Sequence, residues 1–295
     1  MTAQIISGTE IAKQIRQELK QEIAGLRDKY NLIPGLATVL VGDDPASQVY
    51  VGSKARTCEA LGIYSERHDL PAETSEPKLL ALIDRLNKDT RIHGILVQLP
   101  LPKHISEANV LYAIDPDKDV DGFHPVNVGR MMIGQPNYLP CTPHGIQELL
   151  LRSGVKTEGA EVVVVGRSNI VGKPIANILL QKKAGANATV TVCHTATRDI
   201  TFHTRRADIL IVAAGKPKAI TADMVKEGAV VIDVGVNRIG KTAEGKAILC
   251  GDVDFDAVKE KASAITPVPG GVGPMTIVML MQNTVKAAKL AVGLA

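Results

Sequence analysis

Residues 161–174 read EVVVVGRSNIVGKP, an apolar run that ends at a glycine turn and continues into a helical segment. Four consecutive valines are typical of a buried parallel strand. Pro174 suits the first turn of a helix, where its missing N–H would be unpaired in any case. A strand, a tight glycine turn and a helix N-terminus together present backbone N–H groups and the positive end of the helix dipole. This arrangement favours binding of a phosphate.

The spacing of this turn differs from the usual G-x-G-x-x-G fingerprint. Ser168 replaces the second glycine, and Gly172 comes one residue late. A plain strand-to-helix turn, in which Gly166 serves geometry alone, is the alternative interpretation. The repeat of strands around this turn favours a nucleotide site.

Strand-like and helix-like segments alternate along almost the whole chain. The pattern predicts strands at 36–41, 63–68, 93–99, 161–165, 188–193, 207–213 and 229–234, with a further extended piece at 264–268. It predicts helices from Ser7 onward and at 47–61, 75–89, 142–153 and 275–292. Repeated strand–helix–strand units indicate parallel sheets. We therefore expect an α/β fold with two domains around a cleft, the second a Rossmann-like doubly wound parallel sheet.

The boundary between the two domains is expected in residues 115–145, which are rich in Asp, Pro and Gly. This segment is interpreted as a linker and an interdomain cleft. The predicted domains are 1–120 and 140–274, and the C-terminal helix 275–295 is expected to pack back on the first domain.

Composition restricts the class of protein. The 295 residues are 45% hydrophobic and 22% charged, but only 3% are aromatic, so the core must be aliphatic. A net charge of +3 without a run of like charges does not indicate nucleic-acid binding. The four cysteines and seven histidines lack metal-site spacing, so no metal is expected. The cysteines are expected to be buried thiols, and the sequence shows no signal peptide and no membrane-spanning run. These features predict a cytoplasmic protein.

The choice of dinucleotide depends on the end of the strand at 188–193. An NAD site usually places a carboxylate there, on the ribose hydroxyls. This strand ends instead in His194, Thr195, Ala196 and Thr197. Arg167 and Thr195 are suited to hold a ribose phosphate, although either residue would also be ordinary in a solvated loop. The sequence therefore favours NADP over NAD.

Four polar residues of the first half are candidates for chemistry. Tyr50 and Lys54 lie four apart on a predicted helix and share a face, although most such pairs are surface pairs. Gln98 closes an apolar strand. If it meets Lys54, a neutral amide leaves desolvation free to lower the pKa of the lysine towards neutrality. Asp121 lies in a turn-rich loop, where turn capping is the alternative to binding a planar, amidine-like ring edge.

Several motifs in order resemble the bifunctional methylenetetrahydrofolate dehydrogenase/cyclohydrolase family. They are YVGSK (50–54), GILVQLPLP (94–102), DKDVDG (117–122), PCTP (140–143), GRS (166–168), VGKP (171–174) and PVPGGVGPMT (267–276). The resemblance spans nearly the whole chain. It implies a folate-binding first domain, an NADP-binding second domain, tetrahydrofolate substrates and a homodimer.

The resemblance also implies roles for individual residues. Lys54 would handle protons in the cyclohydrolase step, Tyr50 would stack on the folate, Gln98 would orient Lys54, and Asp121 would bind the pterin edge. The cofactor would be held by Gly166, Arg167, Ser168, Thr195 and Val236. Family members often carry Ser at the position of Thr195, and the hydroxyl is retained here.

The expected function is NADP-dependent oxidation of 5,10-methylenetetrahydrofolate to the methenyl form, followed by hydrolysis to 10-formyltetrahydrofolate. Two alternatives stay open at this stage. One is a two-domain NADP dehydrogenase of the shikimate or amino-acid type, and the other is a nucleotide-binding regulatory protein without catalysis.

Overall fold

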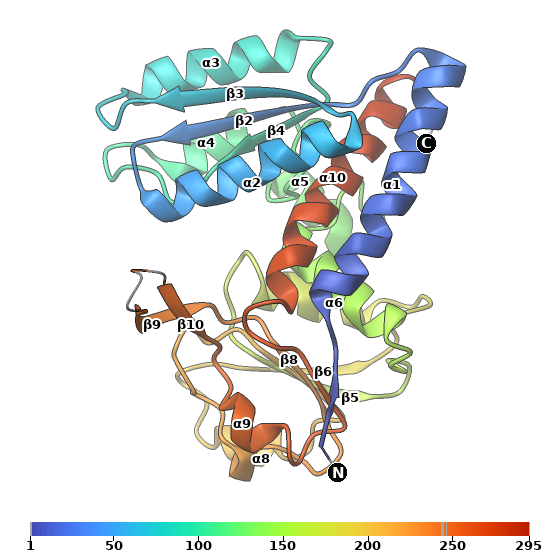
Figure 1. The fold of residues 1–295 in the computed structure, drawn as a ribbon, viewed down its shortest axis with the longest axis vertical. Helices are drawn as coiled ribbons and strands as arrows, with labels where there is room; N and C mark the ends of the chain where they lie inside the picture. Colours follow the sequence, from blue (N-terminus) through green and yellow to red (C-terminus); the bar gives the residue numbers. More distant parts are fainter. Residues whose placement is uncertain (1, 243–244, 246, 295) are drawn as a thin grey trace. The chain divides into compact units, whose positions relative to one another are not determined.

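The computed structural model describes residues 2–242, 245 and 247–294 of the chain (Figure 1). Contacts divide the chain into two compact units. We call Gln14–Cys141 with Ile277–Ala295 the first unit, and Met1–Lys13 with Thr142–Thr276 the second unit. Two long helices, α1 (Gly8–Tyr30) and α10 (Val272–Ala291), run from one unit into the other.

A three-stranded parallel sheet forms the centre of the first unit, in the order β3-β2-β4. The strands are β2 (Gly35–Val41), β3 (Tyr64–Leu70) and β4 (Gly94–Val97). The helices of this unit between α1 and α10 are α2 (Pro45–Leu61), α3 (Glu76–Lys88), α4 (Glu107–Ala113) and α5 (Pro125–Met132). The central strand β2 is buried along its whole length, which explains its uninterrupted apolar run.

Helices cover both faces of this sheet. In Figure 1, α2 and α3 lie on opposite sides of β2. The α3 and α4 side contains the aliphatic core, in which Leu79 and Val110 pack with Val39. On the other side, the Sγ of Cys58 on α2 lies 3.4 Å from the Sδ of Met281 on α10. The C-terminal helix is therefore part of the packing of the first unit.

Residues 115–141 are not a linker, contrary to the expectation from their turn-rich composition. Asp119, Asn127 and Tyr138 are all buried within the first unit. The Nδ2 of Asn127 donates to the Oδ2 of Asp119 at 2.9 Å, and the hydroxyl of Tyr138 donates to the carbonyl of Asp117 at 2.6 Å. Turn-forming residues also occur in packed loops when their polar groups find partners, so composition alone misassigns this segment.

The second unit contains a six-stranded sheet in the order β1-β11-β8-β7-β5-β6, in which every pairing is parallel. Its strands are β1 (Gln4–Ile5), β5 (Glu161–Val165), β6 (Thr189–Cys193), β7 (Ile209–Val212), β8 (Val230–Asp233) and β11 (Ala264–Ile265). Its helices include α6 (Cys141–Arg152), α7 (Gly172–Leu180), α8 (Ile200–Thr204) and α9 (Phe255–Val258). The order reverses at β5, which pairs with β6 on one side and β7 on the other. The predicted α/β class and the Rossmann-like parallel sheet are confirmed.

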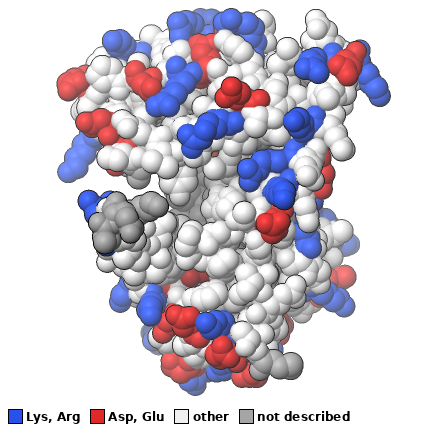
Figure 2. Space-filling view, viewed as in Figure 1, with Lys and Arg blue, Asp and Glu red and all other residues white. Residues whose placement is uncertain are grey.

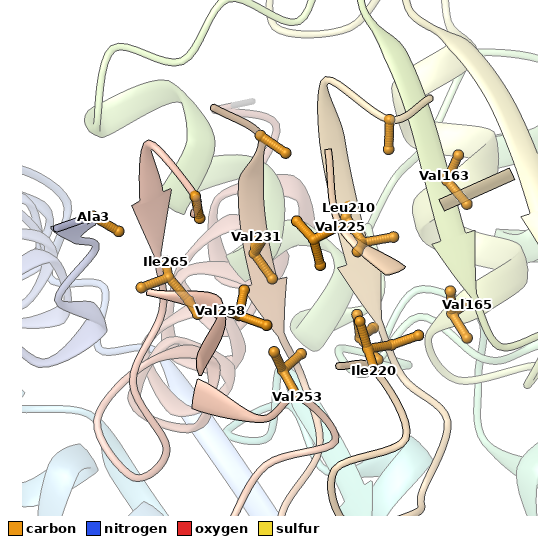
Figure 3. Packing of buried hydrophobic residues seen from close by; sticks show 14 of the residues in the cluster. Ala3, Val163, Val165, Leu210, Ile220, Val225, Val231, Val253, Val258 and Ile265 are labelled. Atoms are coloured by element: carbon orange, nitrogen blue, oxygen red, sulfur yellow. The ribbon is translucent and has the colours of Figure 1, made fainter. Parts of the chain in front are cut away.

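One face of this sheet is covered by an aliphatic cluster (Figure 3). Val163, Leu210, Val231 and Ile265 come from four strands of the sheet and pack together with side chains from the connecting segments. Val253 is one of those side chains and lies in the segment that leads into α9. This cluster fixes the strand ends that carry the loops described below.

Several short strands and helices were not predicted from the sequence pattern. The two-residue strand β1 is too short for a period to be visible, and the predicted strand at 264–268 is paired only at Ala264–Ile265. An antiparallel pair, β9 (Asn237–Lys241) and β10 (Ala247–Cys250), carries several polar residues and was not predicted. The short helices α4, α5, α8 and α9 were also missed, because a few residues show no clear helical repeat.

Surface charge and cysteine chemistry agree with the composition. Figure 2 shows Lys and Arg side chains intermixed with Asp and Glu side chains on the face in view. All four cysteines are free, and Cys58, Cys141 and Cys193 are buried. In the described part of the chain, no helix is both long enough and apolar enough to cross a membrane.

Candidate active site

Tyr50 and Lys54 lie one turn apart on α2, the helix that follows the central strand β2. The carboxylate of Asp44 caps this helix by accepting the backbone N–H of Ser47 at 2.7 Å. The first turns of α2 are thereby held near the carboxyl end of β2. Lys54 is only 7% exposed, whereas Tyr50 is 44% exposed. The two side chains thus combine a buried amine with an exposed aromatic ring.

Gln98 meets Lys54 directly. The Nζ of Lys54 donates to the Oε1 of Gln98 at 2.9 Å. The Nε2 of Gln98 donates to the carbonyl of Leu99 at 2.7 Å, which keeps the amide oxygen turned towards the lysine. Residues 44 positions apart in the chain are brought together because α2 packs on the sheet whose strand β4 ends just before Gln98.

Asp121 is a charged neighbour of Lys54. Burial lowers the pKa of Lys54 from its ordinary value, and the negative charge of Asp121 opposes this shift. Burial raises the pKa of Asp121 in turn, while Lys54 opposes that shift. Because the direct partner of Lys54 is a neutral amide and burial is the largest cause, we take the lysine pKa to be lowered. A lowered pKa makes the neutral amine more available than in an ordinary lysine, which suits a group that exchanges protons.

Cys141 is a further neighbour of Asp121 that sequence reasoning missed. Its thiol is buried and donates to the carbonyl of Val120 at 3.5 Å. Burial raises the pKa of this thiol well above its ordinary value, and the negative charge of Asp121 acts in the same direction. The PCTP motif contains Cys141, yet its thiol was expected to be only a buried structural group. Nothing in the spacing of the cysteines indicated a thiol beside Asp121, so only the motif itself pointed to this position.

The loop that carries Asp121 is held from two sides. Asp119 accepts the backbone N–H of His124 at 2.8 Å. Asn283 on α10 donates to the carbonyl of Val120 at 2.8 Å and to that of Leu139 at 3.0 Å. Asn283 is buried on α10 between Gln282 and Thr284, and sequence reasoning did not single it out. These bonds fix the backbone on both sides of Asp121.

The glycine turn of the second unit is tight, with backbone packed directly against backbone. Gly166 has a φ of +128°, and a Cβ at this position would lie 2.2 Å from the carbonyl oxygen of Ala213. A Cβ at Gly172 would lie 2.2 Å from the carbonyl oxygen of Gly166. Only glycine fits either position, because a side chain would collide with the backbone. The departure from the usual fingerprint therefore does not alter the tight turn.

The side chain of Ser168 binds the backbone at the start of the helix that follows this turn. Its Oγ accepts the backbone N–H of Val171 at 3.1 Å and that of Gly172 at 3.4 Å. Arg167 and Ser168 are exposed at the carboxyl edge of the sheet. An exposed guanidinium beside a helix N-terminus suits a phosphate-bearing ligand.

Thr195 and Val236 lie on other loops of the same edge, after β6 and β8. Both are exposed. The carboxylate nearest in sequence after β6 is Asp199, and its Oδ1 accepts the backbone N–H of Phe202 as the cap of α8. That carboxylate is thus engaged in capping a helix, while the hydroxyl-bearing turn at Thr195 remains open to solvent. The structure brings Gly166, Arg167 and Ser168 together in one turn and places Thr195 and Val236 on neighbouring loops.

The PVPGGVGPMT segment (267–276), whose last five residues belong to α10, also has partners. The backbone N–H of Thr9, at the start of α1, donates to the carbonyl of Gly270 at 3.0 Å. A Cβ at Gly8 would collide with the carbonyl of Gly271, so the two segments pack backbone to backbone. Within the described residues, His, Cys, Asp and Glu form no group of three that could hold a metal ion.

Comparison with known proteins identifies the family. Residues 6–121 match the catalytic domain of tetrahydrofolate dehydrogenase/cyclohydrolase, and residues 140–292 match its NAD(P)-binding domain. The bifunctional protein FolD of Syntrophus aciditrophicus is 71% identical over 294 residues, covering 100% of both chains. The FolD protein of Dehalococcoides mccartyi strain CBDB1 is 67% identical and covers 100% of this chain and 99% of its own.

Solved structures agree. The bifunctional FolD enzyme of Campylobacter jejuni has a TM-score of 0.91 at 50% identity and covers 98% of this chain and 99% of its own. The FolD enzyme of Trypanosoma brucei, complexed with NADP cofactor and inhibitor, has a TM-score of 0.93 at 42% identity, with 99% of each chain covered. The expectation of a folate enzyme with two activities is confirmed, and the shikimate-type alternative is set aside. The chain belongs to the tetrahydrofolate dehydrogenase/cyclohydrolase family.

Proposed function

We propose that this chain oxidises 5,10-methylenetetrahydrofolate with NADP and hydrolyses the methenyl product to 10-formyltetrahydrofolate. The observation that carries the proposal is the buried Lys54 held at 2.9 Å by the neutral Gln98, in a chain of this family. A buried amine with a neutral partner is suited to proton transfer rather than to a permanent ion pair.

In the oxidation step, bound NADP would supply the acceptor for a hydride from the methylene carbon of the folate. No protein base is needed for this transfer, so the chain contributes by positioning its two substrates. The turn of Gly166, Arg167 and Ser168 fits a dinucleotide phosphate, because Gly166 brings backbone close and Arg167 adds an exposed positive charge.

In the hydrolysis step, Lys54 moves the proton. Its neutral amine accepts a proton from water while the water oxygen adds to the cationic methenyl carbon. The bond from that carbon to N5 then breaks, N5 keeps the electron pair, and the Lys54 ammonium protonates it. The remaining hydroxyl proton leaves to solvent, which yields the formyl group and one net proton.

The other candidate residues would hold the folate. We assign the exposed ring of Tyr50 to stacking on the planar pterin, because aromatic faces pack over one another with a favourable offset. Asp121 would accept hydrogen bonds from the amidine-like edge of the pterin. Gln98 would keep Lys54 oriented through the hydrogen bond described above.

NADP is the proposed cofactor in preference to NAD. Arg167 is exposed beside the turn, Thr195 offers a hydroxyl after β6, and the Asp199 carboxylate caps α8. A ribose phosphate would find positive charge and a hydroxyl here, in a place where an NAD site usually has an acidic residue. The Trypanosoma brucei relative with bound NADP supports this choice.

We also infer a homodimer in the cytoplasm. β6 is an edge strand of the six-stranded sheet, and Val192 on it is exposed, as is Leu180 at the end of α7. Exposed edge strands with apolar side chains favour pairing with a second chain. Four free cysteines suit a reducing compartment. Sedimentation of the purified chain at micromolar concentration tests the dimer, and a monomer would reject it.

The first experiment follows both activities in one sample. The purified chain is mixed with methylenetetrahydrofolate and NADP, then with NAD, and reduced cofactor and methenyl product are measured separately. We expect reduction of NADP with little methenyl accumulation. Stoichiometric accumulation would leave a dehydrogenase without cyclohydrolase, and no reduction with either cofactor would reject the proposed function.

The role of Lys54 is tested by Lys54→Met. We expect at least a 100-fold loss of cyclohydrolase activity, because general acid–base groups typically contribute 10²–10⁴-fold. Lys88→Met is the matched control, since Lys88 is an exposed partner of Asp84 on α3. Full cyclohydrolase activity in Lys54→Met would reject the assignment.

A further inference from the structure

Two buried carboxylates lie together at the carboxyl edge of the second-unit sheet. Asp233 is the last residue of β8, and Asp252 follows β10. Asp252 is fully buried and Asp233 is 3% exposed. Buried carboxylates are costly unless hydrogen bonds satisfy them. The partners described below are backbone N–H groups and one amide, so these acids organise backbone.

Asp233 binds the backbone on both sides of the edge. Its Oδ1 accepts the N–H groups of Gly235 and Asp252, each at 2.9 Å, and its Oδ2 accepts the N–H of Val253 at 2.9 Å. The loop after β8 and the segment after β10 are thereby tied to one carboxylate. Burial raises the pKa of Asp233 to about 6, against the effect of these three donors.

Asp252 binds the loop after β7. Its Oδ2 accepts the N–H groups of Ala214 at 2.7 Å and Gly215 at 2.8 Å, and its Oδ1 accepts that of Lys216 at 3.0 Å. The carboxylate of Asp252 accepts a fourth hydrogen bond, from the Nδ2 of Asn237 to Oδ1 at 2.8 Å. Three successive N–H groups that converge on one point form a concavity suited to an anion. In this protein the anion is the chain's own carboxylate.

Glycines make room for both acids. A Cβ at Gly235 would lie 2.2 Å from the Cγ of Asp252, and a Cβ at Gly251 would lie 1.7 Å from the Oδ2 of Asp233. The backbone of Asp252 is itself anchored, because its carbonyl accepts the N–H of Ile220 at 3.1 Å. Ile220 and the neighbouring Val253 belong to the aliphatic cluster of Figure 3. The acids therefore connect a rigid core to three loops.

Sheet order indicates which part of a dinucleotide these loops would meet. The pyrophosphate of a dinucleotide lies at the first turn, here after β5, and the adenosine ribose lies at the end of the second strand, here β6. β7 and β8 are on the other side of β5 from β6. The nicotinamide half must then extend over the loops after β7 and β8, which are the loops held by Asp252 and Asp233.

We propose that Asp252 and Asp233 are positioning residues for the nicotinamide half of the cofactor, holding residues 214–216 and 235–237 in the binding conformation. The proposal rests on the dehydrogenase function proposed above. Val236 is flanked by Gly235 and Asn237, each of which donates to one of the two acids. The exposed Val236 side chain is thus presented from a backbone fixed on both sides. Neither acid touches the reacting atoms.

The test is Asp252→Asn, whose single carbonyl oxygen cannot satisfy the donors that two carboxylate oxygens accept. We expect kcat/KM of the dehydrogenase to fall at least ten-fold, by the same factor with NADP and with NAD, because the nicotinamide half is identical in both. Cyclohydrolase activity on purified methenyltetrahydrofolate needs no cofactor and should stay within two-fold. Asp256→Asn is the control, since Asp256 is an exposed neighbour paired with Lys259.

Binding of adenosine 2′,5′-bisphosphate separates positioning from a general structural role. This probe contains only the adenosine half, so its affinity for Asp252→Asn should equal that for the wild type. If the affinity of Asp252→Asn for the bisphosphate falls by the same factor as its kcat/KM, Asp252 has only a general structural role and the proposal is overturned. A kcat/KM within two-fold of the wild type would also overturn it. Absence of cofactor reduction in the wild type would instead reject the proposed function itself.

Discussion

Gln98→Glu replaces the neutral partner of Lys54 by a carboxylate of nearly the same shape. At the 2.9 Å separation of the Lys54 Nζ and the Gln98 oxygen, two unit charges in an effective dielectric of about 20 attract by about 6 kcal/mol. Desolvation of the new carboxylate and loss of the hydrogen bond to Leu99 oppose this attraction. We therefore expect a net rise of about 1–3 units in the pKa of Lys54, the usual effect of an adjacent opposite charge.

The sign of the effect on catalysis follows from the role of the neutral amine. A higher pKa leaves less neutral Lys54 at a given pH, so the cyclohydrolase rate at pH 6.5 should fall by up to about ten-fold for each unit of that rise. The limb of the pH–rate profile that reports Lys54 should move to higher pH by the same 1–3 units. The assay follows disappearance of methenyltetrahydrofolate from pH 6 to pH 9, after subtraction of the uncatalysed rate at each pH.

Gln98→Met is the control that separates charge from hydrogen bonding. Methionine removes the oxygen acceptor without adding charge, so the limb for Lys54 should not move upward. An unmoved limb in Gln98→Glu would refute the argument that a neutral partner keeps the lysine pKa low. An upward shift in Gln98→Met equal to that in Gln98→Glu would refute it as well, because charge would then not be the cause.

Three further predictions concern other parts of the chain. Gly166→Ala should lower the free energy of unfolding by at least about 2 kcal/mol, because Gly166 has a φ of +128° and a Cβ there would clash with Ala213. Thermal unfolding that matches the wild type would contradict this. Arg167→Ala should raise KM for NADP about ten-fold and leave KM for NAD nearly unchanged, whereas equal effects in steady-state kinetics would count against a contact with the ribose phosphate. Burial raises the pKa of Asp119 to about 6, so the folded chain binds this proton more tightly than the unfolded chain, and its contribution to stability is lost as the pH rises from about 4 to about 6. Asp119→Asn should therefore reduce the fall in the free energy of unfolding over this pH range by up to about 1.4 kcal/mol per pH unit, as measured by urea unfolding. Asp84→Asn, at an exposed carboxylate, is the control. An unchanged dependence on pH in Asp119→Asn would show that Asp119 does not titrate as expected.

The parts of the fold that were predictable from the chain are those with local causes. The valine run at 162–165 and the glycine turn after it place a strand and a helix start because both depend on neighbouring residues alone. Alternation of such units implies parallel pairing, since a strand–helix–strand connection returns the chain in the same direction. Segments without a clear repeat, such as the polar β9 and the four-residue β10, carry no local signal of this kind.

Candidate residues were predictable individually, but most of their interactions were not. Tyr50 and Lys54 share a helix face by spacing, and the family motifs point to Gln98 and Asp121. The bond from Lys54 to Gln98 joins residues 44 apart, and the bond from Asn283 to Val120 joins residues 163 apart. Such contacts depend on how helices pack on a sheet, which composition and period do not encode.

Local sequence therefore determined the α/β class and the glycine turn after β5, because each is a property of a few adjacent residues, whereas Lys54 was singled out only by the family motifs. Tertiary structure alone decided that residues 115–141 are packed, that the Cys141 thiol binds the carbonyl of Val120, and that Asp252 holds the loop after β7. Burial is the physical reason. A carboxylate, thiol or amine acquires its pKa and its partners from the chain segments that exclude water around it, and those segments are distant in sequence.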